Sequence, residues 1–270
     1  MTAEDLVNGE PAGPEKKNVL GLPMDAVTMD QAVACCAAAI RDGRYLSVGV
    51  INAAKVMSMR RDAALRESVV GCDLVLADGQ SVVWASRVLG APLPERVAGI
   101  DLFLELLAEA DREHHRVYFL GAKPRVLSQM LAEVARRWPG LVIAGSKDGY
   151  FGTEEQAEVA GRIRDARPDL LFVGMSSPKK EVFLNRWGES TGARVVHGVG
   201  GSFDVLAGLT RRAPLWYQRH GLEWLYRAWQ EPVRLGRRYL ATNMSFISLV
   251  ALESLRARAR WGRPLVKARG

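Results

Sequence analysis

The residues best suited to chemistry come directly after short apolar runs of the chain. Asp78 follows the run Leu74–Ala77 and precedes a glycine. A carboxylate in such a place can act as a general base or accept a hydrogen bond from a sugar hydroxyl. The spacing fits an alternative equally well, in which Asp78 caps a helix that starts at Gln80. Asn52 follows another apolar run, Tyr45–Ile51, and adds an amide in the same kind of position.

Two loops carry residues that suit a bound anion. GMSSPKKE places hydroxyls and the ammonium groups of Lys179 and Lys180 at a predicted helix start, where backbone N–H groups also favour negative charge. The alternative is a solvated helix start with serine capping and Glu181 in the first turn. The loop GAKP, which begins at Gly121, is similar to a phosphate-approach loop, although an ordinary turn between strand and helix explains it as well.

A third loop, GVGGSFD, offers glycines that let a ligand come close to the backbone, Gly200 among them. Asp204, at its end, can accept a hydrogen bond from a ribose or sugar hydroxyl, or it can serve a helix cap or a local turn. Arg96, in PERVAGID, precedes a predicted helix and can clamp a phosphate with two N–H groups. It can equally pair at the surface with Glu95 or Asp101.

Basic residues concentrate toward the C-terminus of a chain whose formal net charge is +7. The first basic segment contains Arg211, Arg212, Arg219, Arg227, Arg234, Arg237 and Arg238. Four of the seven tryptophans also lie after Thr210. This composition favours an anionic partner, which is nucleic acid, anionic lipid or a phosphorylated substrate. One interpretation is a helix docked on the core with its arginines in solvent, and the other is contact with membrane headgroups.

The sequence lacks the motifs of several common kinds of site and of membrane-spanning proteins. Asp-x-Asp, metal-ligand spacing of His and Cys, and the GxSxG elbow are all absent, so we expect no metal cofactor and no Ser–His–Asp triad. The three cysteines form no CxxC, which favours a reducing compartment. Neither a signal peptide nor an apolar run of about 18 residues is visible, so we expect no membrane span.

The elements that must position these residues alternate between strands and helices. Predicted strands are Tyr45–Ile51, Leu74–Ala77, Val117–Leu120, Leu141–Ala144, Leu170–Val173 and Arg194–His197. Predicted helices between them include Ala53–Glu67, Gly99–Glu113, Pro124–Trp138 and Glu154–Ala166. This alternation predicts an α/β fold with a mostly parallel sheet and helices on both faces, in which ligands bind beyond the carboxyl ends of the strands. We expect a flexible tail over residues 1–17, a catalytic domain over 18–209, and a helical appendage over 210–270.

Together, these motifs resemble the WecG/TagA/CpsF family of bacterial glycosyltransferases, from about Val19 to Asn243. The segments that carry the resemblance are LVLADGQSVVWASRVLG, PLPERVAGIDL, VYFLGAKPRV, DGYF, FVGMSSPKKE, GVGGSFDVLAG, RRAP and GLEWLYRAWQEPVRLGRRY. The resemblance implies a Rossmann-like core and a C-terminal appendage that approaches the membrane.

The activity that the resemblance implies is inverting, metal-independent transfer of a sugar from a UDP-sugar to a polyprenyl-diphosphate-linked acceptor. The sugar would be of the N-acetylmannosamine, N-acetylmannosaminuronate, glucuronate or glucose type. The reaction would serve exopolysaccharide or cell-envelope glycan synthesis at the cytoplasmic face of the membrane. The resemblance also implies that the enzyme can form homo-oligomers.

The resemblance also implies roles for individual residues. Asp78 matches the general base, and Arg96 matches a residue near the donor or acceptor phosphate. On the donor side, Asn52 matches a sugar or acceptor contact, and Tyr150 and Asp204 match residues near the uracil and ribose of UDP. The full set of donor-side candidates is Asn52, Gly121, Tyr150, Lys180, Glu181, Gly200 and Asp204. On the acceptor or membrane side, they are Arg211, Arg212, Arg227, Arg234, Arg237 and Arg238.

Two positions depart from the family pattern. The family commonly has glutamine where this chain has Lys180, and a cation there would suit a carboxylated sugar. It often has threonine where this chain has Val50. The alternatives to a transferase are a membrane-docking protein or a nucleic-acid-binding basic protein without activity, although no motif that reads nucleic acid is present and no nucleic-acid partner is expected.

Overall fold

The computed structural model describes residues 14–214, 216–217, 222–223, 225–226 and 237–261. Its centre is a six-stranded sheet with strand order β4-β3-β8-β7-β5-β6, in which every pairing is parallel. The strands are β3 (Leu46–Ile51), β4 (Leu74–Ala77), β5 (Arg116–Gly121), β6 (Val142–Lys147), β7 (Leu170–Gly174) and β8 (Val195–Gly198). All six predicted strands are therefore confirmed, with β6 running on to Lys147.

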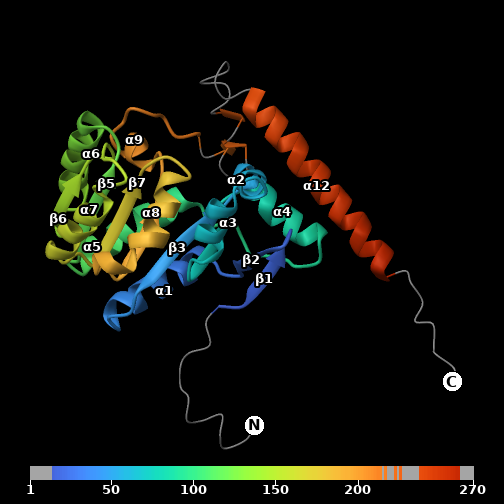
Figure 1. The fold of residues 1–270 in the computed structure, drawn as a ribbon, viewed down its shortest axis with the longest axis horizontal. Coiled ribbons are helices and arrows are strands. Elements are labelled where there is room, and N and C mark those ends of the chain that lie inside the picture. Colours follow the sequence, from blue (N-terminus) through green and yellow to red (C-terminus); the bar gives the residue numbers. More distant parts are fainter. Residues whose placement is uncertain (1–13, 215, 218–221, 224, 227–236, 262–270) are drawn as a thin grey trace, which may run out of the picture.

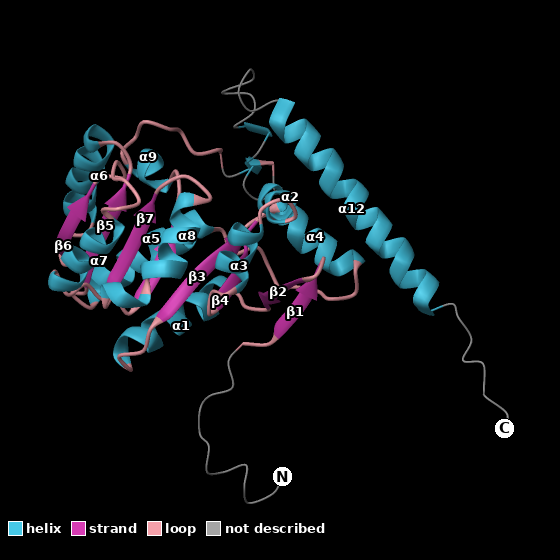
Figure 2. Ribbon diagram, viewed as in Figure 1, coloured by secondary structure: helices cyan, strands magenta, loops and turns pink. Residues whose placement is uncertain are grey.

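Helices cover both faces of the sheet (Figures 1 and 2). One face carries α1 (Met29–Arg41), α5 (Gly99–Arg112), α6 (Pro124–Arg137) and α9 (Ser202–Leu206). The other carries α3 (Ala63–Val70), α7 (Gln156–Asp165) and α8 (Lys179–Trp187), together with the short η2 (Glu189–Thr191). The predicted α/β fold is confirmed, and it explains why the strands are apolar on both sides: each side faces a helix layer.

The remaining helices lie toward the β4 edge of the sheet. They are α2 (Ala53–Met59), α4 (Gln80–Val88) and the long α12 (Arg237–Trp261). Phe246 and Leu249 of α12 are buried among residues of α2 and α4, so this helix packs on the sheet domain although it is far away in sequence.

One predicted helix was wrong. The predicted single helix Ala53–Glu67 is broken into α2 and α3, because the Asp62 carboxylate accepts a hydrogen bond from the Leu65 N–H (3.0 Å) and starts a new helix. Near the start of the described residues, β1 (Lys16–Val19) forms an antiparallel hairpin with β2 (Leu22–Asp25), so the last two residues of the predicted tail, 16 and 17, belong to a strand. Residues 1–13 of that predicted tail lie outside the described residues.

The largest core cluster contains four phenylalanines from four different elements. Phe103 of α5 lies with its ring centroid 4.7 Å from Phe172 of β7 and 5.9 Å from Phe203 of α9. Phe119 of β5 lies 6.0 Å from Phe203. These contacts fix α5 and α9 against the sheet, so the loops that precede both helices have defined positions.

Because all six strands are parallel, the loops after their carboxyl ends lie along one edge of the sheet. We call these six loops, together with the helix starts that follow them, the strand-end rim. Backbone hydrogen bonds join neighbouring loops: Ala122 N donates to Gly174 O (2.9 Å), Gly149 N to Ala122 O (3.1 Å), and Val199 N to Val173 O (3.0 Å).

Candidate active site

Asp78 lies on the strand-end rim and is held by hydrogen bonds to both of its carboxylate oxygens. Asn52 Nδ2 donates to Oδ2 (3.1 Å), and the Gly99 N–H, at the start of α5, donates to Oδ1 (2.9 Å). The alternative cap role does not hold, because the cap residue of α4 is Gly79, without a side-chain cap hydrogen bond. The carboxylate is therefore positioned by two neighbouring strand ends and a helix start, and it is only partly buried.

Asn52 performs two functions with one amide. Its Oδ1 accepts from Lys55 N (3.0 Å) and caps α2, while its Nδ2 bonds Asp78. Gly79 comes so close to Asn52 that a Cβ there would lie 3.0 Å from the Asn52 Cβ. This packing explains the glycine in the ADG motif and fixes the amide beside the carboxylate.

His197 supports the same site from beneath. It is fully buried on β8, with Nε2 3.1 Å from the Gly99 carbonyl oxygen, to which it donates. Burial lowers the pKa of His197, so its neutral form is favoured. The imidazole thus anchors the carbonyl of Gly99, the residue whose N–H group reaches Asp78.

Next to these residues lies a buried charge cluster formed by Lys55, Lys180 and Glu181. Glu181 Oε1 is 2.8 Å from Lys55 Nζ and 2.6 Å from Lys180 Nζ. The side chains are 10%, 8% and 8% exposed respectively. The solvated helix start considered for GMSSPKKE is therefore wrong for Lys180 and Glu181, while Lys179 is exposed.

The charges in this cluster do not balance. Burial opposes ionisation of Glu181, but the ammonium groups of Lys55 and Lys180 outweigh it and lower the pKa of this carboxyl to about 2. Burial and the neighbouring Lys55 lower the pKa of Lys180, and the attraction of Glu181 does not fully compensate. One carboxylate shared by two ammonium groups leaves an excess of positive charge.

The other residues predicted on the donor side lie on adjacent loops of the rim. Gly121, at the end of β5, has φ +129°, and a Cβ there would lie 2.5 Å from the Gly174 backbone. The close packing of β5 against β7 therefore explains why position 121 is a glycine. Gly200 follows β8 with φ +55°, and Tyr150, after β6, is 65% exposed. Asp204 lies within α9 and is half-buried. The structure joins Asn52 to Asp78 by a hydrogen bond and Lys180 to Glu181 by an ion pair. The other four residues lie on neighbouring loops of the same rim.

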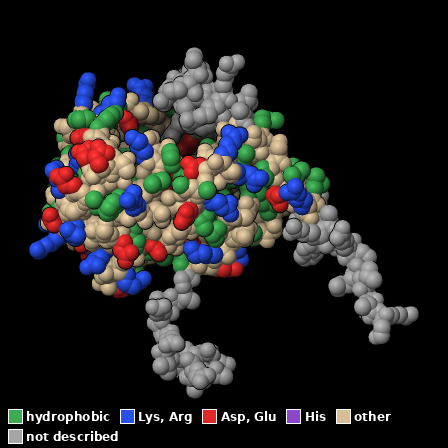
Figure 3. All heavy atoms as spheres, viewed as in Figure 1, with side chains coloured by type: hydrophobic (Ala, Val, Ile, Leu, Met, Phe, Trp, Pro, Cys, Tyr) green, Lys and Arg blue, Asp and Glu red, His purple; other side chains and the backbone are tan. Residues whose placement is uncertain are grey.

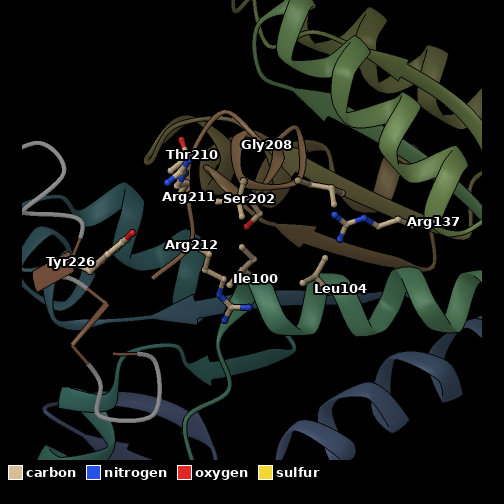
Figure 4. Close-up of a pocket in the computed structure, with 11 residues that line it drawn as sticks. Ile100, Leu104, Arg137, Ser202, Gly208, Thr210, Arg211, Arg212 and Tyr226 are labelled. Carbon is tan, nitrogen blue, oxygen red and sulfur yellow. The ribbon is translucent and has the colours of Figure 1, made fainter. Parts of the chain in front are cut away.

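A pocket of about 480 Å³ lies beside the first turn of α5, and Ile100, the residue after Gly99, lines it (Figure 4). Its apolar lining comes from Ile100 and Leu104 of α5 and from Val205 and Leu206 of α9. Its polar lining includes Arg137, Ser202, Thr210, Arg211, Arg212 and Tyr226. Volume and lining suit an amphipathic, anionic ligand. Arg211 and Arg212, predicted on the acceptor side, therefore line a pocket beside the start of α5, the helix whose Gly99 N–H reaches Asp78.

Arg96 and Arg212 belong to a network of four charged side chains that we call the ion quartet, with Asp101 and Glu223. Arg212 bonds Asp101 with both terminal nitrogens, at 2.6 and 2.8 Å, and lies 3.7 Å from Glu223. Arg96 lies 3.3 Å from Glu223 and 3.7 Å from Asp101. Arg96 therefore has the predicted partner Asp101 but is mostly buried, with 14% of its side chain exposed.

The structure does not describe the side chains of the other four arginines predicted on the acceptor side. Arg227 and Arg234 lie outside the described residues, as does the predicted turn at 231–232. Arg237 and Arg238 start α12, but their side chains are not described. Within the described residues, every helix is too short or too polar to span a bilayer.

Most of the chain matches one known protein family. Residues 17–260 match the description "Glycosyl transferase WecG/TagA/CpsF family". The chain belongs to this family. The resemblance seen in the motifs is thereby confirmed over most of the chain.

One relative from this comparison is a protein of Bacillus spizizenii strain W23. It is named N-acetylglucosaminyldiphosphoundecaprenol N-acetyl-beta-D-mannosaminyltransferase and is 42% identical over 165 residues. The match covers 61% of this chain and 63% of the relative, which is less than two thirds of the relative's length.

Three residues of this candidate site were not predicted from the sequence: Lys55, His197 and Glu223. Lys55 has a usable signal, since it is three residues after Asn52 and must return to the rim on the first turn of α2. His197 and Glu223 have none, because a buried histidine on a strand and a glutamate in a basic segment are ordinary patterns. Only the packing of β8 against α5, and of the C-terminal segment against the domain, gives them roles.

Proposed function

We propose that this protein transfers a sugar from a UDP-sugar to an acceptor linked to a polyprenyl diphosphate, in exopolysaccharide or cell-envelope glycan synthesis. The observation that carries the proposal is the Asp78 carboxylate, held by Asn52 and Gly99 between a cationic cluster and an apolar pocket with arginines. Family membership supports it, and the name of the Bacillus relative contains the same kind of acceptor.

In the proposed reaction, Asp78 removes the proton from the acceptor hydroxyl while that oxygen attacks the anomeric carbon of the donor. The bond from the anomeric carbon to UDP breaks on the opposite side, so the configuration inverts. Asn52 and the Gly99 N–H hold the carboxylate in one orientation, which lowers the entropic cost of reaching the reacting geometry.

The proposal assigns the two substrates to two sides of Asp78. Donor binding would use the loops after β5 to β8, with Tyr150 and Asp204 near the nucleotide. Acceptor binding would use the 480 Å³ pocket, with lipid carbons on Ile100 and Leu104 and the diphosphate near Arg211 and Arg212. Arginine, lysine and helix-start N–H groups would balance the charge of the leaving UDP, so the proposal includes no metal.

The proposal is tested by Asp78→Asn, which keeps the size of the side chain but removes the base. We expect kcat for UDP release to fall about 10²-fold or more, with UDP affinity unchanged, in an assay that contains EDTA. The probes are UDP-N-acetylmannosamine and UDP-glucuronate, with short-chain polyprenyl-diphosphate N-acetylglucosamine as acceptor.

The matched control is Asp62→Asn at the start of α3, where asparagine also caps a helix, and it should retain activity. Full activity in Asp78→Asn would remove Asp78 from the base role. Failure of the wild-type protein to bind any UDP-sugar would overturn the proposed function itself.

A further inference from the structure

The composition of the Lys55–Lys180–Glu181 cluster is not explained by a structural role alone. A buried ion pair is stable when its charges balance and its polar atoms are bonded. Here two ammonium groups share a single carboxylate oxygen, Glu181 Oε1. The other oxygen, Oε2, is buried and accepts no hydrogen bond within the described part of the chain. A cluster that served only to join α2 to α8 would need one lysine and would satisfy both oxygens.

The unused bonding groups of the cluster are of two kinds. Each ammonium group has three N–H donors, and the described contacts use one on each. Glu181 Oε2 is a bare acceptor beside them. A ligand that satisfies both kinds must present a negatively charged acceptor to the lysines and an O–H or N–H donor to Oε2.

Lys180 lies next to the loop that follows β8 on the strand-end rim. Its side chain lies along the end of β8, where a Cβ on Gly198 would be 3.1 Å from Lys180 Cδ and one on Gly200 would be 3.9 Å from Cε. Lys180 shares Glu181 with Lys55, which lies in the first turn of α2, the helix that Asn52 caps beside Asp78. The charge of Asp78 raises the pKa of Lys180. The two glycines leave room for the methylene groups of Lys180 along the end of β8, and its ammonium group lies against Glu181.

A diphosphate does not meet these requirements. It carries acceptors only, and the bare Glu181 oxygen would repel it. A sugar with a carboxylate has both kinds of group: acidic oxygens for an ammonium group and neighbouring hydroxyl or amide donors for Oε2.

We propose that Lys180 selects a donor whose transferred sugar carries a carboxylate, while Glu181 Oε2 accepts a hydrogen bond from a hydroxyl or amide of the same sugar. This inference rests on the proposed function and narrows its donor to the uronate class. It differs from the neutral sugar in the name of the Bacillus relative.

The test measures donor binding by calorimetry, which needs no acceptor. Two pairs of probes differ only in carboxylate against hydroxymethyl: UDP-glucuronate with UDP-glucose, and UDP-N-acetylmannosaminuronate with UDP-N-acetylmannosamine. We expect the wild-type protein to bind at least one uronate about tenfold or more tightly than its neutral partner. Lys180→Gln should abolish that preference by weakening uronate binding, with less than about threefold change for the neutral donor.

The matched control is Lys179→Gln, because Lys179 is the adjacent, exposed lysine with the same charge. It should keep the preference, and Lys180→Met serves as a second variant if the glutamine variant is unstable. Equal loss of both donors in the Lys180 variants would show a diphosphate contact and overturn the inference. So would wild-type binding without uronate preference, whereas transfer of a neutral sugar would leave the proposed function standing.

Discussion

At the scale of single residues, Gly174 shows how a position that binds no substrate can shape the strand-end rim. A Cβ at Gly174 would lie 2.4 Å from the ring of Phe203, and one at Gly121 would lie 2.5 Å from the Gly174 backbone. These close approaches set the spacing of β5, β7 and α9. The loops that carry Gly200 and Asp204 depend on that spacing, because both flank Phe203 in the chain.

Gly174→Ala should therefore destabilise the protein. The added methyl group must displace a fully buried aromatic ring, and overpacking of this kind costs about 1–3 kcal/mol. Urea unfolding measures the change in the free energy of unfolding. The control is Gly161→Ala within α7, where the new Cβ meets only the far end of Arg164 at 4.0 Å, so a gain of about 0.5–1 kcal/mol is expected. Equal stability of both variants would contradict this account.

The sequence predicts the residues at strand ends better than those that support them. Asp78 and Asn52 could be placed at one edge because both follow apolar strands of a parallel sheet. Lys180 and Glu181 were predicted near an anion, but their burial was not, because a lysine pair at a helix start is usually solvated. Burial here depends on α8 packing against α3 and on Lys55 approaching from α2, which are contacts between segments far apart in sequence.

At the scale of elements, the ion quartet is the described link between α5 and the C-terminal segment. Asp101 lies in the first turn of α5, and Glu223 lies beyond Arg212 in the segment that lines the pocket. Two arginines and two carboxylates have no net charge. Under the proposed function, an acceptor diphosphate near Arg212 would therefore compete with Asp101 for the same guanidinium group.

Removing one charge of the quartet should loosen the segment around Tyr217 and Tyr226. In Asp101→Asn, Arg212 loses its two-bond partner while half-buried, and we expect local opening to become easier by about 1–2 kcal/mol. The measurement is the rate of chymotryptic cleavage at these tyrosines, which should rise about five- to thirtyfold. Glu109→Gln is the control, since Glu109 pairs with Arg112 on the surface of the same helix. An unchanged cleavage rate in Asp101→Asn would mean that the quartet does not hold the segment.

Some elements were beyond prediction for local reasons. The β1–β2 hairpin turns at Leu20 and Gly21, which both have positive φ, and leucine is not a residue that signals such a turn. Its place beside β4 is fixed by Asp25, which accepts from Val75 N (2.7 Å), a contact across 50 positions. The sheet itself was predictable because each strand is a separate apolar run with a helix pattern after it.

At the scale of the whole molecule, α12 presents two apolar faces. Phe246 and Leu249 are buried against α2 and α4, whereas Met244, Ile247 and Leu255 are 57%, 59% and 63% exposed on the opposite side. Hydrophobic side chains are visible along this edge in Figure 3, where charges of both signs are interspersed over the rest of the face. Basic residues follow along the chain: Arg256, Arg258, Arg260, Arg263, Lys267 and Arg269. An apolar stripe with a basic continuation suits an anionic membrane surface, where the predicted acceptor would be anchored.

We therefore expect the outer face of α12 to hold the protein at anionic bilayers. Changing Met244, Ile247 and Leu255 together to serine should weaken co-sedimentation with phosphatidylglycerol vesicles at least about tenfold, because each side chain loses burial in the headgroup region. Higher salt should weaken binding of the wild-type protein as well, since screening reduces the attraction of the arginines. The control changes Val142 and Ile143 to threonine on β6, an exposed apolar pair at the opposite end of the sheet, and should bind normally. If the triple variant sediments like the wild type, the outer face of α12 is not the membrane contact.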